Sequence, residues 1–272
     1  MQTHFAGSNL PWGRKSRAHW AVAPTKRAIV FVHGFGGDAI GTWQQFPRLL
    51  TLQQQCCGHD LIFFGYDGLR SYAQNSAVKL RDFLRALGEE AASVVNPHLD
   101  PAARRPDDFA YEQITIVAHS LGAVVSRRAL LDAHLLAEAE GGFDWLQRTQ
   151  MVFFAPAHMG ANVLELATSV MSTFKIPFLG ALARFRFPVL ADLEEESHTL
   201  TVLRDETLEA MKKPGNDYLR AKRVILADRD VVVVPHRFAN DPPPDTLPGN
   251  HTSICKPSDA FADPVLRIME VV

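Results

Sequence analysis

The sequence predicts an α/β fold, in which a mostly parallel central sheet is flanked by helices, and three observations support it. Five apolar runs rich in β-branched residues alternate with stretches of helical patterning, which is the element order of such a sheet. The runs are apolar almost without interruption, as in strands buried on both faces. The length of 272 residues is enough for one domain to bury its core without a metal or a disulfide. We therefore expect a single domain over residues 1–272.

The predicted strands are the apolar runs themselves. They cover Ala28–Val32, Asp60–Phe64, Ile114–Ala118, Met151–Phe154 and Arg223–Leu226. Helices are expected between or after them, at Thr42–Gln53, Ala73–Val95, Leu121–Ala139 and Asp263–Val272. The second of these helices carries apolar residues at roughly helical spacing. The pair Gly141-Gly142 is expected to end the third, and an Asp-Pro pair suits the start of the fourth.

One segment interrupts this alternation. Residues Ala157 to Ala221 contain no strong strand pattern, and an acidic run, Asp192–Glu196, lies within them. Four apolar residues of the segment would share one face of a helix: Val163, Leu166, Val170 and Phe174. We interpret residues 157–221 as a helical insertion between two strands, placed where a lid or cap would cover an active site. The alternative is a pair of additional packing helices with no gating role.

Composition excludes several classes of function. The formal net charge is -2, from 28 basic and 30 acidic side chains, so the chain lacks the concentrated basic surface that nucleic acid requires. Three cysteines without a CxxC pair indicate neither a disulfide framework nor a zinc site. The most apolar long stretch, Ile176–Leu190, is interrupted by prolines and arginines and is too short and charged to cross a bilayer. With no apolar signal segment at the start, we expect a soluble cytoplasmic protein.

The strongest local signal is the segment ITIVAHSLGAVVSRRAL, in which a strand pattern enters a tight turn at Ser120 and a helix pattern leaves it. A nucleophilic serine on such a strand-turn-helix elbow is typical of the α/β-hydrolase fold. The turn requires small residues two positions on either side. Gly122 meets this requirement, and Ala118 stands where the usual pattern has glycine. The amide of Leu121, at the helix N-terminus, is the first candidate donor to an oxyanion.

A second strand runs into the glycine-rich loop of IVFVHGFGG, residues 29–37. Glycines allow a backbone N–H to approach the serine closely, and we expect Phe35 to supply the second oxyanion donor. His33 is expected to shape this loop. A phosphate-binding loop is excluded because no glycine-lysine pair followed by serine or threonine is present.

A serine nucleophile needs a base that is oriented by a carboxylate, and in this fold the chain order is serine, acid, histidine. The strand in RVILADRDVVVVPH is followed by Asp228 and Asp230, and LPGNHTSICKP places His251 in a loop before the last helix. Alternation cannot separate the two acids, which would share a face. Position favours Asp230, in a turn followed by apolar residues and proline. His236 is the main rival base; three other histidines are less favoured, namely His119, His158 and His198.

The segments VHGFGGDAIGTW, LIFFGYD, VAHSLGAVVSRRAL, FFAPAHMGAN and HTSICKP resemble lipase-like serine esterases of the GPI-inositol-deacylase-like branch of the α/β hydrolases. The resemblance runs from about Ala28 to the C-terminus. It implies that Ser120 is the nucleophile, His251 the base and Asp230 the acid. A family loop that usually reads T-P-H-x-G is APAHMG here. Because an alanine separates proline from histidine in this loop, no role is carried over to His158.

The sequence therefore predicts hydrolysis of a carboxylic ester, with a small molecule or lipid carrying an apolar acyl group as substrate. No cofactor or metal is expected. An acyltransferase would use the same acyl-enzyme and stays an alternative. A non-catalytic binding protein on a hydrolase fold is a third interpretation, although the serine, the acid and the histidine are all present.

Overall fold

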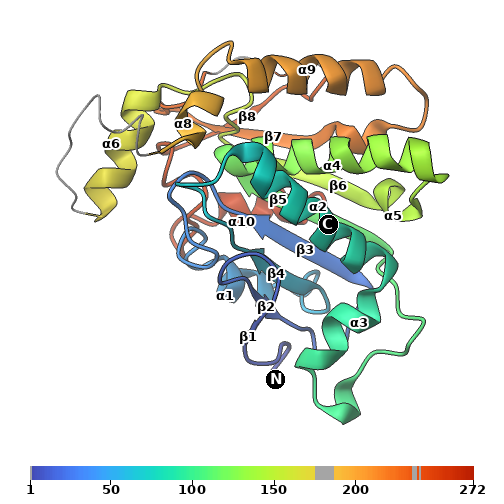
Figure 1. The fold of residues 1–272 in the computed structure, drawn as a ribbon. Helices are drawn as coiled ribbons and strands as arrows, with labels where there is room; N and C mark the ends of the chain where they lie inside the picture. Colours follow the sequence, from blue (N-terminus) through green and yellow to red (C-terminus); the bar gives the residue numbers. More distant parts are fainter. Residues whose placement is uncertain (1, 175–186, 235–237, 239) are drawn as a thin grey trace.

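The computed structural model describes residues 2–174, 187–234, 238 and 240–272. Through this part of the chain runs an eight-stranded sheet with the order β1-β2-β4-β3-β5-β6-β7-β8 (Figure 1). Every pairing from β4 to β8 is parallel, and β1 and β2 are attached antiparallel at one edge. The α/β architecture with a mostly parallel sheet is thus confirmed.

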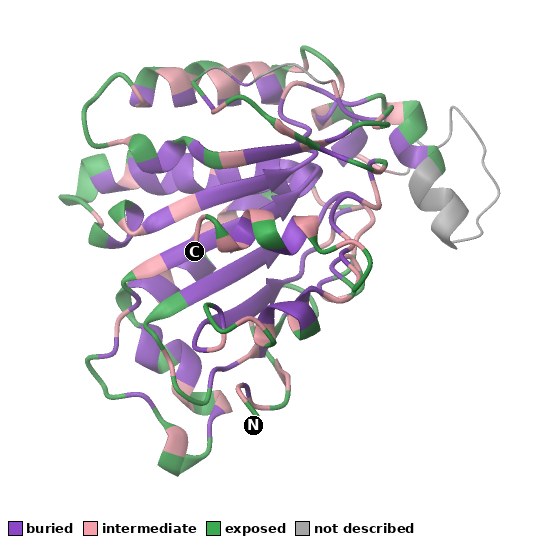
Figure 2. Cartoon of the chain, turned by 180° about the vertical axis from the view of Figure 1, so that it is seen from behind, coloured by how far each residue is buried: buried purple, intermediate pink, exposed green. Residues whose placement is uncertain are grey.

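All five predicted strands are present at the centre of the sheet. They are β3 (Arg27–Val32), β4 (Asp60–Phe64), β5 (Gln113–His119), β6 (Thr149–Phe154) and β7 (Ala221–Ala227). In the central register Val30 lies opposite Ile62 on one side and Ile116 on the other. These side chains are fully buried because helices cover both faces of the sheet (Figure 2), which explains why the strands are continuous apolar runs.

Three short strands complete the edges and were not predicted. They are β1 (Ser8–Asn9), β2 (Arg17–His19) and β8 (Asp245–Leu247). Each has only two or three residues, most of them polar, so no apolar run marks them. Short polar strands at the edges also leave little exposed backbone for pairing with another sheet.

The helices form one layer on each face of the sheet. On one face α2 (Ala73–Glu89) and α4 (Leu121–Glu140) pack together, and α9 (His198–Ala210) packs on α4 (Figure 1). On the other face α1 (Phe46–Thr51) contacts α10 (Asp263–Met269) (Figure 2). Two shorter helices, α3 (Ala91–Val95) and α5 (Asp144–Gln147), connect these layers to the sheet.

Two of the predicted helices differ from those observed. The expected helix over Thr42–Gln53 begins only at α1, where Pro47 occupies the first turn, a position that needs no N–H donor. The expected helix over Ala73–Val95 is divided into α2 and α3, because Glu90 leaves helical geometry with φ of -131° and ψ of 44°. As predicted, α4 ends at a glycine: Gly141 caps it with φ of 99°, a left-handed conformation that suits glycine.

Between β6 and β7 the described residues form helices and no strand of the sheet. They contain α6 (Val163–Phe174), α8 (Val189–Asp192) and α9. The first two lie beyond the carboxyl ends of the parallel strands (Figure 1). Leu166 is buried on the inner side of α6. The side chains of Val170 and Phe174, expected on the same face, lie outside the described part of the structure.

Candidate active site

The centre of the site is Ser120, on the sharp turn between β5 and α4. Its backbone has φ of 53° and ψ of -121°, which is strained for a residue with a side chain. A Cβ atom on Gly122 would lie 2.3 Å from the carbonyl oxygen of Val32, so this position requires glycine. Ala118, by contrast, lies in β5 between Val32 and Phe153 and tolerates a methyl group. The elbow expected from the sequence is therefore present.

The structure brings the three predicted catalytic candidates together from distant parts of the chain. The Nε2 atom of His251 lies 3.0 Å from Oγ of Ser120, and its Nδ1 atom lies 2.9 Å from Oδ2 of Asp230. All three side chains are buried, with Ser120 only 1% exposed. This arrangement has the geometry of a nucleophile, a base and a carboxylate that orients the base.

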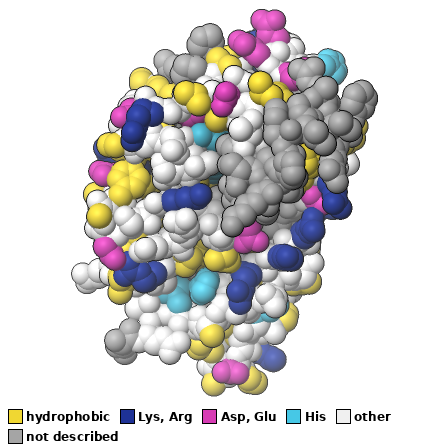
Figure 3. Space-filling view, turned by 90° about the vertical axis from the view of Figure 1, so that its left-hand side faces the viewer, with side chains coloured by type: hydrophobic (Ala, Val, Ile, Leu, Met, Phe, Trp, Pro, Cys, Tyr) yellow, Lys and Arg dark blue, Asp and Glu magenta, His cyan; other side chains and the backbone are white. Residues whose placement is uncertain are grey.

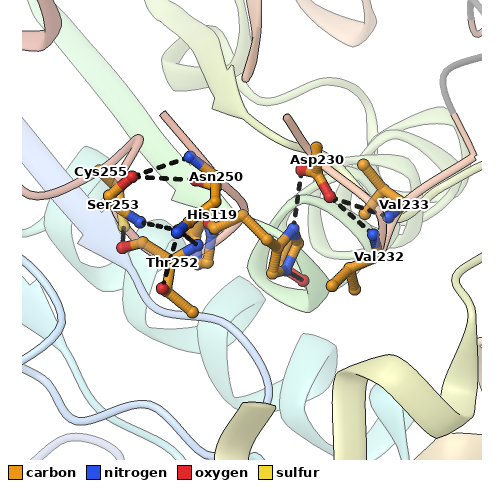
Figure 4. A network of polar contacts seen from close by, with 10 residues as sticks. His119, Asp230, Val232, Val233, Asn250, Thr252, Ser253 and Cys255 are labelled. Carbon is orange, nitrogen blue, oxygen red and sulfur yellow. Dashed lines mark hydrogen bonds and ion pairs between the residues drawn. The ribbon is translucent and has the colours of Figure 1, made fainter. Parts of the chain in front are cut away.

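Asp230 is fixed by its own loop as well as by His251. Its Oδ1 atom accepts hydrogen bonds from the amides of Val232 and Val233, at 2.8 and 3.2 Å (Figure 4). Burial acts to raise the pKa of Asp230, but the hydrogen bond and charge of His251 and these two amides outweigh it and lower the pKa. The carboxylate is therefore ionised at neutral pH and aimed at the imidazole.

Asp228 has a different environment although it is only two residues away. Its Oδ1 atom accepts a hydrogen bond from the amide of Gly249 at 2.8 Å, and its side chain is half exposed. Residues 228 and 229 form a turn after β7, closed by a hydrogen bond from the Asp230 amide to Ala227. Strand alternation does not apply within a turn, so the two acids point to different partners.

The loop carrying Asp230 is paired with the beginning of the segment that follows β6. The amide of Asn162 donates to Val232 at 2.6 Å, and the amide of Val234 donates to Gly160 at 3.1 Å. Between these bonds Ala161 forms an antiparallel bridge with Val233. The outward amide of Ala161 donates to Leu193 at 2.9 Å. The two ends of the segment 163–192 therefore lie next to each other, beside the loop that carries Asp230.

The glycine-rich loop after β3 lies directly against the serine. A Cβ atom on Gly34 would lie 2.9 Å from Cβ of Ser120, so only glycine permits this approach. The amides of Phe35 and Leu121 donate no hydrogen bond to any other described part of the chain. These are the two amides expected to bind an oxyanion. The side chain of Phe35 packs edge-on against Phe187, with ring centroids 5.8 Å apart.

His33 shapes this loop, as expected, and is not available as a base. Its Nδ1–H donates to the carbonyl of Gly34 at 2.9 Å, and its Nε2 accepts from the amide of Tyr66 at 3.3 Å. The Tyr66 ring stacks on the imidazole, and its hydroxyl donates to the His33 carbonyl. Burial lowers the pKa of His33, so the ring remains neutral.

Two of the other candidate bases, His158 and His198, form no hydrogen bond with Ser120, whose Oγ is bonded to His251. His198 is exposed at the start of α9, and His236 lies outside the described residues. His158 is buried in a separate cluster, where its Nε2 is 3.9 Å from Asp241. In that cluster Arg127 is completely buried and pairs with Asp241 at 2.5 Å. This ion pair joins α4 to the loop that follows Asp230.

One contact was missed by sequence reasoning. His119 is a less favoured base in the sequence and no contact with His251 is predicted for it, yet its ring lies 4.9 Å from that of His251, centroid to centroid. Its Nε2 atom is 2.8 Å from the main-chain oxygen of His251. The only sequence signal for this contact is the position of His119 directly before the serine.

The comparison with protein families decides the classification. Residues 29–263 match the profile of the alpha/beta hydrolase family. This chain belongs to that family. The predicted α/β-hydrolase fold is thereby confirmed, and the match extends over every element that carries a candidate residue of this alpha/beta hydrolase. No curated protein matches the sequence.

Solved structures with the same fold are distant in sequence. The mature form of the lipase BlEst2 from Bacillus licheniformis is 16% identical, with a TM-score of 0.55 over 98% of this alpha/beta hydrolase and 97% of the lipase. This hydrolase spans 54% of the propeptide form of the same lipase. Esterase B from Lactobacillus rhamnosis is 12% identical, with a TM-score of 0.52 over 97% and 85%. The peroxisomal alpha-beta-hydrolase Lpx1 from Saccharomyces cerevisiae is 10% identical, with a TM-score of 0.53 over 99% and 90%.

Two further properties concern ligands and membranes. Among the described residues, no three His, Cys, Asp or Glu side chains lie together as metal ligands would. Within the same residues, every helix falls short of the length or apolar character needed to cross a bilayer.

The face of the molecule at the carboxyl ends of the strands carries charges of both signs, with apolar side chains between them, wherever described atoms are visible (Figure 3).

Proposed function

We propose that this alpha/beta hydrolase is a serine esterase that cleaves carboxylic esters through an acyl-enzyme on Ser120. The observation that carries the proposal is the continuous hydrogen-bonded chain from Ser120 through His251 to Asp230, with distances of 3.0 and 2.9 Å. A serine hydroxyl is a poor nucleophile at neutral pH, and an adjacent oriented imidazole is what activates it.

In the proposed mechanism, His251 accepts the proton of Ser120 as Oγ attacks the ester carbonyl carbon. The tetrahedral intermediate collapses when His251 returns this proton to the alcohol oxygen, which leaves. Water then attacks the acyl-enzyme, giving its proton to His251, and the acid is released as Ser120 is regenerated. Asp230 stays ionised throughout and stabilises the imidazolium. Its lowered pKa supports this role.

The amides of Phe35 and Leu121 are the proposed donors to the oxyanion. Both lack an acceptor in the described part of the chain, and Leu121 opens α4, whose N-terminus carries partial positive charge. A donor that is already aimed at the developing charge needs no reorganisation during the reaction.

The proposed substrate is a small-molecule or lipid ester with an apolar acyl group. Two exposed apolar side chains adjoin the paired segments beside Asp230: Val231 is 70% exposed and Leu164 is 57% exposed. Two of the similar structures are named a lipase and an esterase, which agrees with this substrate class. On the basis of its sequence resemblance, we place this protein in the GPI-inositol-deacylase-like branch of the family as a proposal.

We further propose that the insertion at residues 157–221 borders the acyl pocket. Support comes from Phe187, which packs on Phe35 of the glycine-rich loop, and from Asp192, which accepts a hydrogen bond from the Ala73 amide at the start of α2. Phe187→Ala should therefore change the preference for acyl chain length among p-nitrophenyl esters. Unchanged preference would leave the insertion with a packing role only.

The test of the proposed reaction is labelling by a fluorophosphonate, which reacts with activated serines. Intact-mass spectrometry should find one adduct on the wild type and none on Ser120→Ala. Ser126→Ala is the matched control, since this serine is also buried in the elbow helix, and it should label normally. An adduct that persists on folded Ser120→Ala would contradict the assignment of the nucleophile.

A further inference from the structure

The histidine before the nucleophile is hydrogen-bonded to the main chain of the histidine beside it. The Nε2 atom of His119 lies 2.8 Å from the carbonyl oxygen of His251, and both residues are buried. A carbonyl oxygen can only accept, so the Nε2 atom of His119 must carry the proton. The ring therefore acts as a donor to the backbone of the proposed base.

The two partners of this bond are held very differently. His119 is the last residue of β5 and pairs with Phe154 of β6, so its backbone belongs to the centre of the sheet. His251 lies in a turn outside any strand or helix. This turn is organised mainly by Asn250, whose side-chain oxygen accepts from the amides of Thr252 and Ser253 (Figure 4). The bond from His119 connects the turn to the sheet.

His119 is neutral at the pH of the reaction, which suits a side chain that only donates a hydrogen bond. Burial and the neighbouring His251 lower the pKa of His119 to about 3. The ring stays neutral when His251 becomes protonated during the reaction, and no second positive charge arises beside the imidazolium. The edge of the ring at Nδ1 lies against the glycine-rich loop, since a Cβ atom on Gly34 would lie 3.0 Å from Nδ1 of His119.

We propose that His119 is a positioning residue, which fixes the backbone of His251 so that its imidazole lies within reach of both Ser120 and Asp230. This inference rests on the proposed esterase function. The side chain of His119 bonds the main chain of His251 and forms no hydrogen bond with Oγ of Ser120, so in this proposal it acts through His251. His119 and Ser120 are adjacent in the chain. The imidazole of His119 bonds the backbone of His251 and the hydroxyl of Ser120 bonds its side chain, so this pair of residues sets the distance between nucleophile and base.

The experiment compares three variants of the full-length protein on a short p-nitrophenyl ester. His119→Leu removes the donor. His119→Gln keeps one, because the amide nitrogen of glutamine is as many bonds from Cα as Nε2 of histidine. His4→Leu is the matched control: His4 is also buried and its Nε2 lies 2.7 Å from the main-chain oxygen of another histidine, His59. This control lies beyond β2 at the far edge of the sheet.

We expect His119→Leu to lower kcat by about 10–100-fold with KM within about twofold, since misplacing a catalytic group by about 1 Å costs on the order of 100-fold. His119→Gln should recover most of kcat. His4→Leu should lose stability and retain kcat. If His119→Leu does not fold, His119→Asn replaces it, because its shorter side chain cannot place a donor at the Nε2 position.

The outcomes separate this inference from the proposed function. A wild-type enzyme that is labelled by fluorophosphonate while folded His119→Leu keeps full kcat overturns the positioning role alone. Equal loss in His119→Leu and His119→Gln also overturns it, because the donor would then be irrelevant. A wild-type protein that is neither labelled nor active overturns the proposed function, and the inference with it.

Discussion

Asp230 and His251 are joined by a 2.9 Å hydrogen bond in which the carboxylate is itself held by two amides of its own loop. The carboxylate cannot rotate away from the imidazole without losing those two bonds. An acid fixed in this way keeps the proton on Nδ1 of the imidazole and leaves Nε2 unprotonated toward Ser120.

Asp230→Asn should therefore lower kcat by about 10³–10⁴-fold, because an amide does not hold the imidazole in the required tautomer. The measurement is kcat on a short p-nitrophenyl ester, with circular dichroism to verify folding. Asp228→Asn is the control. Its carboxylate accepts from the loop amide of Gly249 and lies 3.6 Å from the guanidinium of Arg229, without a bond to His251, so turnover should change little. A larger loss at Asp228 than at Asp230 would reverse the assignment.

Gly122→Ala should destabilise the fold by at least about 1–3 kcal/mol, the usual cost of overpacking. The added methyl group would meet two backbone carbonyls, those of Val32 and His33, at 2.3 and 2.5 Å, and the backbone cannot easily yield. Urea unfolding followed by fluorescence measures the change. Gly41→Ala is a suitable comparison because its Cβ would make only ordinary contacts, the nearest at 3.4 Å. Equal stability of the two variants would contradict the clash.

Arg127→Met should reduce the free energy of unfolding by about 3–5 kcal/mol, since it leaves the buried carboxylate of Asp241 without its guanidinium. Arg127 also lies 4.0 Å from the centre of the Phe238 ring and donates to the carbonyl of Leu219, so packing is lost as well. Arg204→Met removes an exposed arginine paired with its sequence neighbour and should change far less. Similar denaturation midpoints for both variants would show that the buried pair contributes little.

Stability should decrease as the pH falls from about 7 to 4.5. Burial lowers the pKa of His59 to about 4 and that of His119 to about 3, and it also lowers the pKa of His33 and of His158 below the ordinary histidine value. Histidines in the unfolded chain titrate near 6.5, so below this pH the unfolded state binds more protons. The stabilisation is complete above about pH 6.5 and is lost as the pH falls toward the lowered values.

Replacing His59 by glutamine tests this dependence outside the proposed site. Over pH 6 to 4.5, the slope of unfolding free energy against pH should decrease by up to about 1.4 kcal/mol per pH unit, the contribution of one proton. Urea unfolding at a series of pH values provides the measurement. A slope that is the same in His59→Gln as in the wild type would mean that His59 titrates normally in the folded protein.

The central strands and the elbow could be predicted because their signals are local. Buried parallel strands such as β5 must be apolar along their whole length, and the left-handed turn at Ser120 imposes small neighbours within two residues. The short strands β1, β2 and β8 depend on pairing with other segments, namely β2, β4 and β7, and carry no such signal. The division of the expected helix at Glu90 is marked only by Gly88, two residues earlier, which is still inside α2 and packs against Trp145.

The sequence limited the candidate acid to two residues, with position favouring Asp230 over Asp228. Alternation along a strand could not separate them, and the reason is geometric. Asp228 and Asp230 lie in a turn whose partners, Gly249 and His251, are about twenty residues away along the chain. Which acid meets which partner depends on how two loops pair. The contact of His119 with the main chain of His251 is hidden for the same reason, because a backbone carbonyl leaves no trace in residue identity.

The hydrogen bond between Ala161 and Leu193 has a consequence for how this protein could diversify. After β6 the chain passes Ala161 and comes back beside it at Leu193, before α9 and β7, and this stem is also paired with the loop of the candidate acid. The entropy of closing a loop grows only slowly with its length, so the arm between these two residues can lengthen, shorten or be exchanged at small energetic cost. The register of the acid loop would be preserved in each case. Given the proposed position of this insertion beside the acyl pocket, exchanging the arm on an unaltered stem would be a route to new substrate ranges.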